Sequence, residues 1–566
     1  MQETVDMGGA GDTRGRGWVL GVGALSGAAL TVTLALVATS IIIPSPAVAG
    51  PPPHFVEEAQ AAGLIHTYDG EFTFFVGGGV AVFDCNNDGR QDLYLAGGSN
   101  PAALFRNNSP IGGALHFETV PEQSTDLTGV AGAYPIDIDS DGNTDLAVLR
   151  VGENVILQGT GDCRFERANE TWGIDGGDAW TAAFSATWEE NETLPTLAFG
   201  NYLKPDSRDE ATGICADHAL FRPGRAVYEP PVALSPGFCA LSILFSDWNR
   251  SGSADLRMTN DRHYYRDGEE QLWQVVPGET PRPYTHDEGW QQMRIWGMGI
   301  ASHDLTGDGR PEVFLTSQGD NKLQTLRVDT DADTGAPTYD DIALDAGATA
   351  TRPFTGDVAL PSTAWHAEFQ DVNNDRFMDL YVSKGNVEAT PGYAAADPNN
   401  LMLGDPDGTF REVAQEAGIV NLARTRGAAL ADFNLDGLLD LVEVNRRQNV
   451  TLWRNVGAQA TDSPMGNWIS IRLRQSGANR DGIGSWVEVD AGGSTTSREV
   501  TIGGGHAGGA LGWLHFGLGD AGTARIRVQW PDGETGPWLT IDADQFALIE
   551  RGFQTPQIWD PGTTPP

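Results

Sequence analysis

Residues 84–93 read DCNNDGRQDL and directly follow an apolar run, GVAVF at 79–83. The pattern, D-x-[DNT]-x-[DS]-G-x-x-[DE]-[LV], returns as DIDSDGNTDL (137–146), DWNRSGSADL (247–256), DLTGDGRPEV (304–313), DVNNDRFMDL (371–380) and DFNLDGLLDL (432–441). Oxygen-bearing side chains at positions 1, 3, 5 and 9 can converge on one point, and glycine at position 6 permits a sharp turn. A single copy could be only a polar turn. Six copies in one frame predict metal sites, and dense hard oxygen ligands favour Ca²⁺.

The spacing of these loops predicts a repeat. Their first aspartates are 53, 110, 57, 67 and 61 residues apart, and the double gap predicts a hidden unit at Trp180–Leu203 whose ligands are lost. Each unit alternates short β-rich runs with turn clusters, which is typical of a propeller blade. We therefore predict an all-β chain with a seven-bladed propeller over 50–456. Strands after Gly50 should close the ring by completing the blade that begins near Asp432.

The first 49 residues have the character of an export signal. Gly17–Val56 holds no Lys, Arg, Asp or Glu, Trp18–Ile43 is mostly apolar, and Ala47-Val48-Ala49 offers a small-residue cleavage site. This layout predicts a signal peptide cleaved after Ala49. A retained N-terminal membrane anchor stays open, because about 26 residues can span a bilayer. Either form places the remainder outside the cytoplasm: secreted, periplasmic or on the cell surface.

Cysteine content and charge narrow the chemistry further. Cys85, Cys163, Cys215 and Cys239 all follow the export segment, which permits two disulfides in any of three pairings, or free buried thiols. The net charge is −41, with 77 acidic and 36 basic residues. This charge repels nucleic acid and anionic membranes, so we expect no nucleic-acid partner and no membrane contact beyond an uncleaved anchor.

The stretch FVGGGVAVFDCNNDGRQDLYLAGG at 75–98 resembles the FG-GAP repeat of integrin α-subunit propellers and of bacterial VCBS-type proteins. The resemblance implies Ca²⁺ bound by side chains at loop positions 1, 3, 5 and 9 and by the carbonyl of position 7. On this chain the implied metal residues are Asp84, Asn86, Asp88, Arg90, Asp92, Asp137, Asp139, Asp141, Asn143, Asp145, Asp247, Asn249, Ser251, Ser253, Asp255, Asp304, Thr306, Asp308, Arg310, Glu312, Asp371, Asn373, Asp375, Phe377, Asp379, Asp432, Asn434, Asp436, Leu438 and Asp440.

Three loops depart from this pattern. Ser251 replaces the carboxylate of position 5, Glu312 replaces the aspartate of position 9, and Arg376 replaces the turn glycine. We expect weaker sites there, with the loops at Asp247 and Asp371 the weakest. The other three loops keep every side-chain position and should bind most tightly.

Residues 467–552 are predicted to form a second all-β segment, followed by a tail at 553–566. It resembles the ASPIC/UnbV domain that follows FG-GAP repeats in cartilage acidic protein and bacterial relatives. The matching motifs are NRDGIG (479–484), REV (498–500), LHFGLG (514–519) and WPDG (530–533), whereas GGHAGG (504–509) departs from the family. The polar linker Gly457–Gly466 predicts a boundary, so we expect this small β-domain to fold beside the ring rather than within it.

No catalytic motif stands out. His303 and His366 lie beside metal loops, and packed histidines are the preferred interpretation. Trp290, Trp296 and Trp365 could form a carbohydrate platform, although core packing is favoured. We therefore predict no enzyme but an exported calcium-binding propeller, a binding or adhesion module for an extracellular protein or glycan. The alternatives are an extracellular polysaccharide-active enzyme on a calcium-stabilised propeller and a cell-envelope structural or assembly factor.

Overall fold

The computed structural model describes residues 49–121, 123–205, 213–261, 268–327, 336–349, 361–388, 393–394, 396–458 and 464–565. The predicted signal peptide or anchor, apart from Ala49, lies outside these residues. Strands dominate, and the described helices are single turns such as η1 (Phe72–Phe74), α1 (Asn169–Trp172), η4 (His286–Glu288) and α2 (Ala414–Ala417). No described helix is long and apolar enough to span a membrane.

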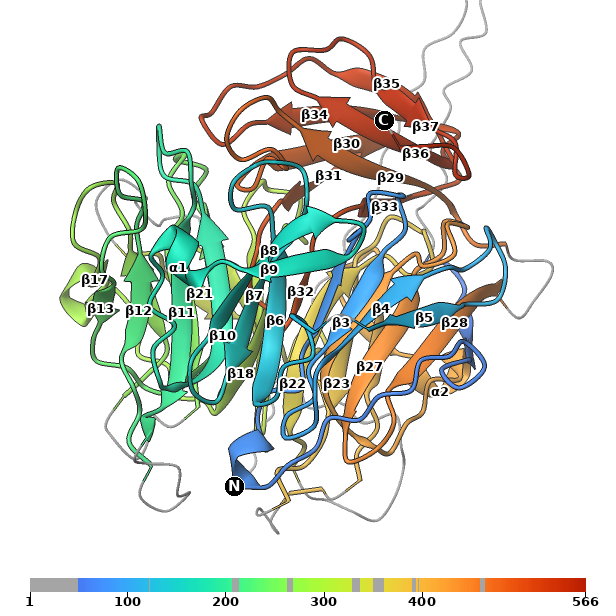
Figure 1. The fold of residues 1–566 in the computed structure, drawn as a ribbon. Coiled ribbons are helices and arrows are strands. Elements are labelled where there is room, and N and C mark those ends of the chain that lie inside the picture. The colour runs from blue at the N-terminus through green and yellow to red at the C-terminus, as the bar shows by residue number, and fades with distance from the viewer. Residues whose placement is uncertain are drawn as a thin grey trace, which may run out of the picture. The chain divides into compact units, whose positions relative to one another are not determined.

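Up to residue 458 the described strands form seven sheets (Figure 1). The sheets, from inner to outer strand, are β2 (Val80–Phe83), β3 (Asp92–Leu95), β4 (Ala103–Asn107) and β5 (Phe117–Val120); β6 (Val130–Ile136), β7 (Asp145–Arg150), β8 (Val155–Gly161) and β9 (Arg164–Arg167); β10 (Trp180–Thr187), β11 (Thr196–Leu203), β12 (His218–Phe221) and β13 (Val232–Leu234); β14 (Ala240–Ser246), β15 (Asp255–Asn260), β16 (Gln271–Gln274) and β17 (Arg282–Pro283); β18 (Gly297–His303), β19 (Glu312–Ser317), β20 (Lys322–Leu326) and β21 (Tyr339–Asp341); β22 (Ala364–Gln370), β23 (Asp379–Lys384), β24 (Asn400–Gly404) and β25 (Phe410–Glu412); and β26 (Arg424–Ala431), β27 (Asp440–Arg446), β28 (Thr451–Ala458) and β1 (Pro53–Glu57).

These sheets are the blades of a β-propeller. The inner strands contact one another in the order β2, β6, β10, β14, β18, β22 and β26, and β26 contacts β2 again. Strand β1 pairs antiparallel with β28, with Phe55 opposite Asn455, and thereby supplies the outer strand of the last blade, as predicted. The hidden unit is also present, since β10 and β11 begin and end at Trp180 and Leu203. The inner strands are buried because neighbouring blades cover both of their faces.

Each predicted metal loop joins an inner strand to the second strand of its blade. The residue before the loop is paired with position 9, as Phe83 is with Asp92 and Ala431 is with Asp440. This register recurs in all six blades that carry a loop. The loops therefore all follow the same end of their inner strands, on one face of the ring.

The C-terminal segment forms two further sheets that pack against each other (Figure 1). One contains β33 (Leu514–Gly519), β29 (Asn467–Arg474), β36 (Gln545–Glu550) and β37 (Gln557–Trp559), and the other β31 (Ser494–Glu499), β30 (Trp486–Ala491), β34 (Thr523–Gln529) and β35 (Leu539–Asp542). Their shared core includes Ile471, Val487, Ile526, Phe516 and Ile549.

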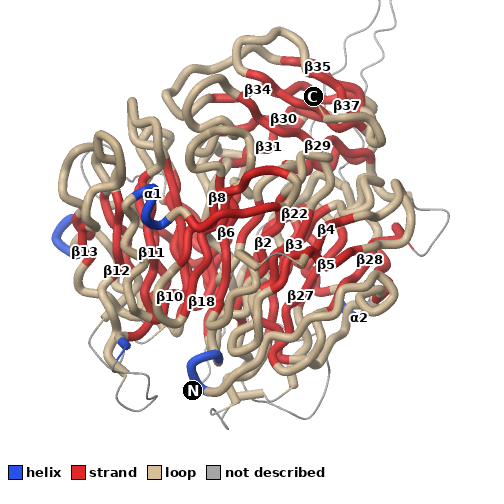
Figure 2. The backbone as a smooth tube through the Cα atoms, viewed as in Figure 1, coloured by secondary structure: helices blue, strands red, loops and turns tan. Residues whose placement is uncertain are grey.

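The expectation that this domain lies wholly beside the ring is wrong for residues 500–511, which we call the channel segment. It runs between the inner strands, and β32 (Gly509–Ala510), labelled in Figure 1, pairs parallel with β2. In Figure 2 the backbone is almost entirely strand and loop, with only short pieces of helix. Gly504 and Gly505 donate backbone hydrogen bonds to Ile243 and Ile300 at 2.8 and 2.7 Å, and Ala133 donates to Ala507 at 3.1 Å. The inner strands are sheet edges whose backbone groups need partners, and a glycine-rich strand is narrow enough to supply them.

Two disulfides are present, Cys85–Cys163 and Cys215–Cys239, with Cα atoms 4.6 and 4.8 Å apart. The structure therefore selects one of the three possible pairings and excludes free thiols among the four cysteines. Structural disulfides persist in oxidising compartments, which favours an extracytoplasmic location.

Candidate functional site

The six acidic loops share one backbone conformation. Position 4 has positive φ in every loop: Asn87 (58°), Ser140 (59°), Arg250 (55°), Gly307 (71°), Asn374 (61°) and Leu435 (57°). Position 6 does so as well: Gly89 (87°), Gly142 (89°), Gly252 (84°), Gly309 (85°), Arg376 (81°) and Gly437 (84°). The turn that glycine favours is therefore kept even where arginine replaces it.

Hydrogen bonds hold each loop around its acidic side chains. The carboxylate of Asp84 accepts from the backbone N–H groups of Asp88 and Gly89 at 3.1 and 2.8 Å. Asp92 accepts from the N–H groups of Cys85 at 2.7 Å and Asn107 at 2.8 Å. The loops at Asp137 and Asp432 repeat these contacts. Positions 1 and 9 are thus fixed by the backbone and face a common centre.

The second loop brings three carboxylates together. Oxygen atoms of Asp137, Asp139 and Asp145 lie within 4.8 Å of one another, close enough to hold one metal ion. Asp137 and Asp145 are buried. Burial, followed by the nearby charge of Asp481, raises the pKa of Asp137 to about 7. Carboxylates gathered in this way repel each other unless a proton or a cation compensates them.

The position-3 side chains support a cation in the loops at Asp84 and Asp432. The amide oxygens of Asn86 and Asn434 are buried and lack a hydrogen-bond partner, while their amide nitrogens donate to Asp88 and Asp436 at 3.1 and 3.0 Å. Burial and the neighbouring Asp436 raise the pKa of Asp432 to about 8. An orphaned amide oxygen among oxygen-only donors is the environment that a hard divalent cation fits.

The loop at Asp304 is adapted to its longer position-9 side chain. Glu312 Oε2 accepts from the N–H of Leu305 at 2.8 Å, the role that Asp92 has toward Cys85 in the first loop. Asp304 Oδ1 is buried without a hydrogen-bond partner. This loop therefore also retains an unpaired oxygen.

The loop at Asp247 has protein donors where ligands were expected. Asp255 Oδ2 accepts from Trp248 Nε1 and from the hydroxyl of Tyr284, both at 2.9 Å. Ser251 Oγ donates to Asp247 at 3.2 Å. These bonds occupy lone pairs that a cation would need, and the weaker site at this loop stays a prediction.

In the blade without an acidic loop, side chains of the blade itself donate to the carboxylate of the turn. In the turn between β10 and β11, Glu189 accepts from Arg222 Nε at 2.6 Å and from Thr196 Oγ1 at 2.7 Å. Within the part of the chain that the structure describes, one further cluster of possible ligands consists of Cys85, Asp92 and Cys163, but its sulfur atoms form a disulfide and are not available to a metal.

The C-terminal domain contacts the loop face of the propeller. Trp513 Nε1 donates to Gly89 O at 2.9 Å, Glu499 accepts from the N–H of Asp247 at 2.7 Å, and His515 Nε2 lies 2.7 Å from Asn374 Oδ1. Ser497 Oγ donates to Asp304, and Arg376 donates to Ala491 O at 3.2 Å. Sequence reasoning missed this role, although Glu499 and His515 lie in two of the quoted C-terminal motifs.

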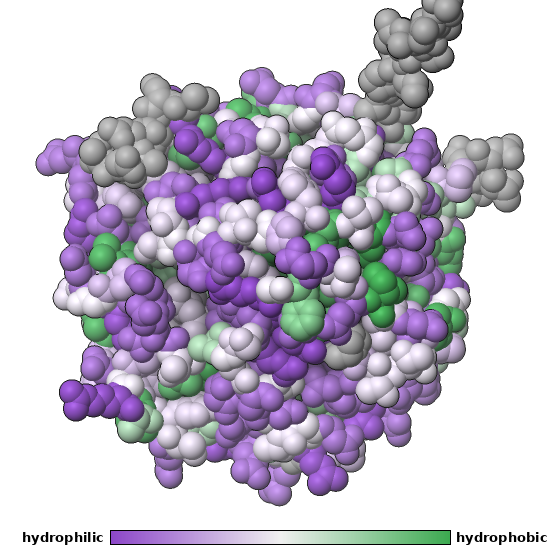
Figure 3. All heavy atoms as spheres, turned by 90° about the horizontal axis from the view of Figure 1, so that it is seen from above, coloured by the Kyte–Doolittle hydropathy of each residue, from purple (hydrophilic) through white to green (hydrophobic). Residues whose placement is uncertain are grey.

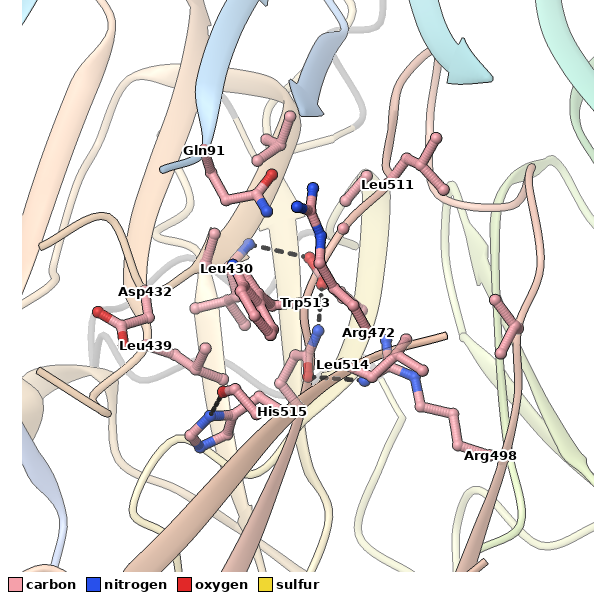
Figure 4. Close-up of a pocket in the computed structure, with 18 of the residues that line it drawn as sticks. Gln91, Leu430, Asp432, Leu439, Arg472, Arg498, Leu511, Trp513, Leu514 and His515 are labelled. Carbon is pink, nitrogen blue, oxygen red and sulfur yellow. Dashed lines mark hydrogen bonds between the residues drawn. The ribbon is translucent and has the colours of Figure 1, made fainter. Parts of the chain in front are cut away.

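A polar cavity of about 140 Å³ lies between the two domains (Figure 4). Arg472 contributes to it, with its guanidinium carbon 5.2 Å from the ring centre of Trp513. Arg498 donates to Gln370 at 3.0 Å, and Gln370 donates to Glu368 at 2.8 Å. Polar and charged side chains of both domains thus meet at the channel entrance, where hydrogen bonds fix Arg498, Gln370 and Glu368 in position.

The singled-out histidines and tryptophans are mostly packed. His303 is buried and burial lowers its pKa to about 3, while buried His366 accepts from the N–H of His506 in the channel segment at 3.1 Å. Trp365 is fully buried and Trp290 nearly so. Trp296 is half-buried, with its ring centre 6.3 Å from that of Tyr393.

Comparison with known proteins agrees with this architecture. The FG-GAP-like repeat matches residues 84–148 and 371–443, and the ASPIC and UnbV domain matches residues 475–556. No curated protein matches the chain in sequence.

Solved structures give only distant likenesses, and at their TM-scores none bears on function. BBS1N from a complex with ARL6DN is 11% identical, covers 72% of this chain and 98% of its own, and has a TM-score of 0.39. An Agrocybe aegerita lectin that recognises non-reducing terminal N-acetylglucosamine is 13% identical, and the match covers 67% of this chain and 91% of the lectin, with a TM-score of 0.38. The extracellular domain of a hybrid two-component system from B. thetaiotaomicron is 9% identical, and the match covers 88% of this chain and 59% of that domain's chain, with a TM-score of 0.38. The chain therefore contains FG-GAP-like repeats at 84–148 and 371–443 and a C-terminal ASPIC and UnbV domain at 475–556.

Proposed function

We propose that this protein is an exported, calcium-binding propeller that serves as a binding or adhesion module for an extracellular protein or glycan. The observation that carries the calcium part is the shared loop geometry, with buried oxygen atoms that lack a partner in the loops at Asp84 and Asp432. Four side chains and one carbonyl per loop suit Ca²⁺, which accepts six to eight oxygens in flexible geometry, better than Mg²⁺, which needs a small octahedral site.

In this proposal the loops also seat the C-terminal domain. Bound calcium would compensate carboxylates such as Asp137 and Asp432 and fix the loop backbones that donate to and accept from that domain. Asp84 illustrates the arrangement, because its carboxylate lies 3.5 Å from Arg472 of the C-terminal domain. Loss of calcium should therefore loosen both the loops and the domain interface.

The partner-binding surface is proposed at the opposite mouth of the channel, where the inner strands begin. Half-buried aromatic side chains gather there: Phe72, Phe75, Trp296 and Tyr393. Arg424 and Arg447 both pair with Glu388, at 3.3 and 3.1 Å. Aromatic faces beside fixed polar groups suit a sugar ring or an extended peptide. Figure 3 shows the molecule from above, where hydrophobic residues lie scattered among hydrophilic ones.

The test is a glycan array and a pull-down from native cell surfaces, each with calcium and with EGTA. We expect specific binding in calcium that Trp296→Ala reduces about tenfold or more. Trp538→Ala is the matched control, because Trp538 is a half-buried tryptophan of the C-terminal domain. Binding that is unchanged by Trp296→Ala would contradict the proposed surface. Product release from an acidic polysaccharide would instead favour the enzymatic alternative.

A further inference from the structure

Gly50 lies against the fifth metal loop. Its backbone nitrogen donates to Asp375 Oδ2 at 2.5 Å, and Asn373 Nδ2 donates to the carbonyl of Pro51 at 3.4 Å. A β-carbon at Gly50 would meet Asn373 Nδ2 and Asp375 Cβ at 2.9 Å, closer than real contacts allow. Residue 50 therefore fits this place only as glycine unless the loop shifts.

The chain that follows fixes this contact in place. Pro51 and Pro52 lead directly into β1, whose first residue, Pro53, is paired with Ala458 of the last blade. Consecutive prolines restrict the backbone φ to about −65°, so the short connection has little freedom. The strand that closes the ring thus also positions the nitrogen of Gly50.

This contact distinguishes the fifth loop from its counterparts. The position-5 carboxylates of the first and sixth loops, Asp88 and Asp436, accept hydrogen bonds from the position-3 amide and the position-7 N–H of their own loops. Asp375 accepts the same two bonds and, in addition, the bond from Gly50. In the fifth loop Asp371, Asp375 and Asp379 are all buried. Its arginine, Arg376, is directed to Ala491 of the C-terminal domain.

Gly50 is also the first residue after the predicted Ala47-Val48-Ala49 cleavage site. We propose that processing at this bond creates an α-ammonium group on Gly50 that forms an ion pair with Asp375, so that the mature N-terminus is a built-in cation of the fifth loop. An export peptidase would hydrolyse the Ala49–Gly50 peptide bond with water, leaving a carboxylate on Ala49 and the ammonium on Gly50. The inference rests on the export that we propose but does not need calcium at any other loop.

The first experiment measures the intact mass of the full chain isolated from its native envelope. A mass that corresponds to residues 50–566 supports the inference. A retained segment before Gly50, or a cleavage at another bond, overturns it.

The second experiment compares mature protein that has a free Gly50 amine with the same protein Nα-acetylated at Gly50, both with calcium in excess. Acetylation removes the charge and should lower Tm by roughly 1–3 °C. Asp375→Asn should abolish this difference, whereas Asp436→Asn, the matched change in the sixth loop, should leave it intact. Because acetylation needs no substitution, it decides the question even where a variant fails to fold.

Equal Tm values for the free and acetylated forms would overturn the ion pair. Calcium titration of the same samples separates this inference from the proposed function. A protein that binds calcium but has the same Tm with and without acetylation contradicts only the role of Gly50. A protein whose Tm falls on acetylation but that binds no calcium contradicts only the calcium proposal.

Discussion

Gly79→Ala should destabilise the protein by displacing the channel segment. Gly79 precedes β2 and its φ is one that any residue adopts, but a β-carbon there would lie 1.8 Å from the carbonyl oxygen of Ala507. Normal contact needs about 3.4 Å or more, so Ala507 must move and its hydrogen bond from Ala133 is lost. Overpacking costs about 1–3 kcal/mol and the lost bond about 1 kcal/mol. We expect a loss of about 2–4 kcal/mol in the free energy of unfolding.

Two measurements test this prediction. Calorimetry should show a Tm lower by several degrees, and hydrogen exchange should show faster exchange of the amides at 500–511. Gly522→Ala is the control, because that glycine has no left-handed φ and no atom within 4 Å of its β-carbon. A Gly79→Ala protein with parental Tm and parental amide protection would refute the placement of this segment between the blades.

Three other perturbations address the metal loops and the disulfides. Asp137→Ala should reduce the gain in the free energy of unfolding that calcium causes by about 1.4 kcal/mol at a tenfold excess of calcium over Kd, measured as a smaller rise in Tm. A parental response to calcium would show that this loop is only a turn. In EGTA, Tm should fall as the pH rises from about 4 to about 8, because the folded-state pKa values of Asp137 (about 7) and Asp432 (about 8) exceed the unfolded value near 4. Excess calcium should remove this fall. A Tm in EGTA that does not change over this pH range would contradict the burial of these carboxylates. Replacing Cys85 and Cys163 by serine should lower the free energy of unfolding by about 4.5 kcal/mol, because this disulfide closes a separation of 78 residues. Replacing Cys215 and Cys239, separated by 24 residues, should lower it by about 3.5 kcal/mol. Equal losses on thermal melting would contradict the chain-entropy explanation.

The propeller could be predicted because its signals are local and repeated. The loop pattern at Asp84 combines ligand spacing with one obligatory turn, and the positive φ at Gly89 shows why glycine recurs there. The period between loops then indicated the hidden unit at Trp180–Leu203, and the unfinished last blade indicated that β1 would complete it.

What escaped prediction depends on surfaces that exist only after folding. GGHAGG at 504–509 has no periodicity of its own, and its place follows from sheet edges that the assembled blades turn toward the channel. Glu499 and Arg376 meet the opposite domain for the same reason. The disulfide pairing likewise joins residues whose proximity is set by neighbouring blades, as between Cys85 and Cys163.

We expect removal of the C-terminal domain to destabilise the propeller, although the sequence alone suggests two domains that fold separately. A chain that ends at Gly457 would lose the channel segment and expose the edges of the inner strands. We therefore expect it to melt at a lower temperature than the full chain. A truncated protein with the parental Tm would show that the propeller needs no support from this domain.

The most direct test of the account is the calcium content of the purified protein. Extracellular calcium modules bind with Kd values of about 10⁻⁴–10⁻³ M, so the protein should be dialysed against millimolar calcium and analysed by elemental mass spectrometry. We predict at least three calcium ions per chain, one for each loop that keeps every side-chain ligand, at Asp84, Asp137 and Asp432. A chain that retains no calcium under these conditions would contradict the account.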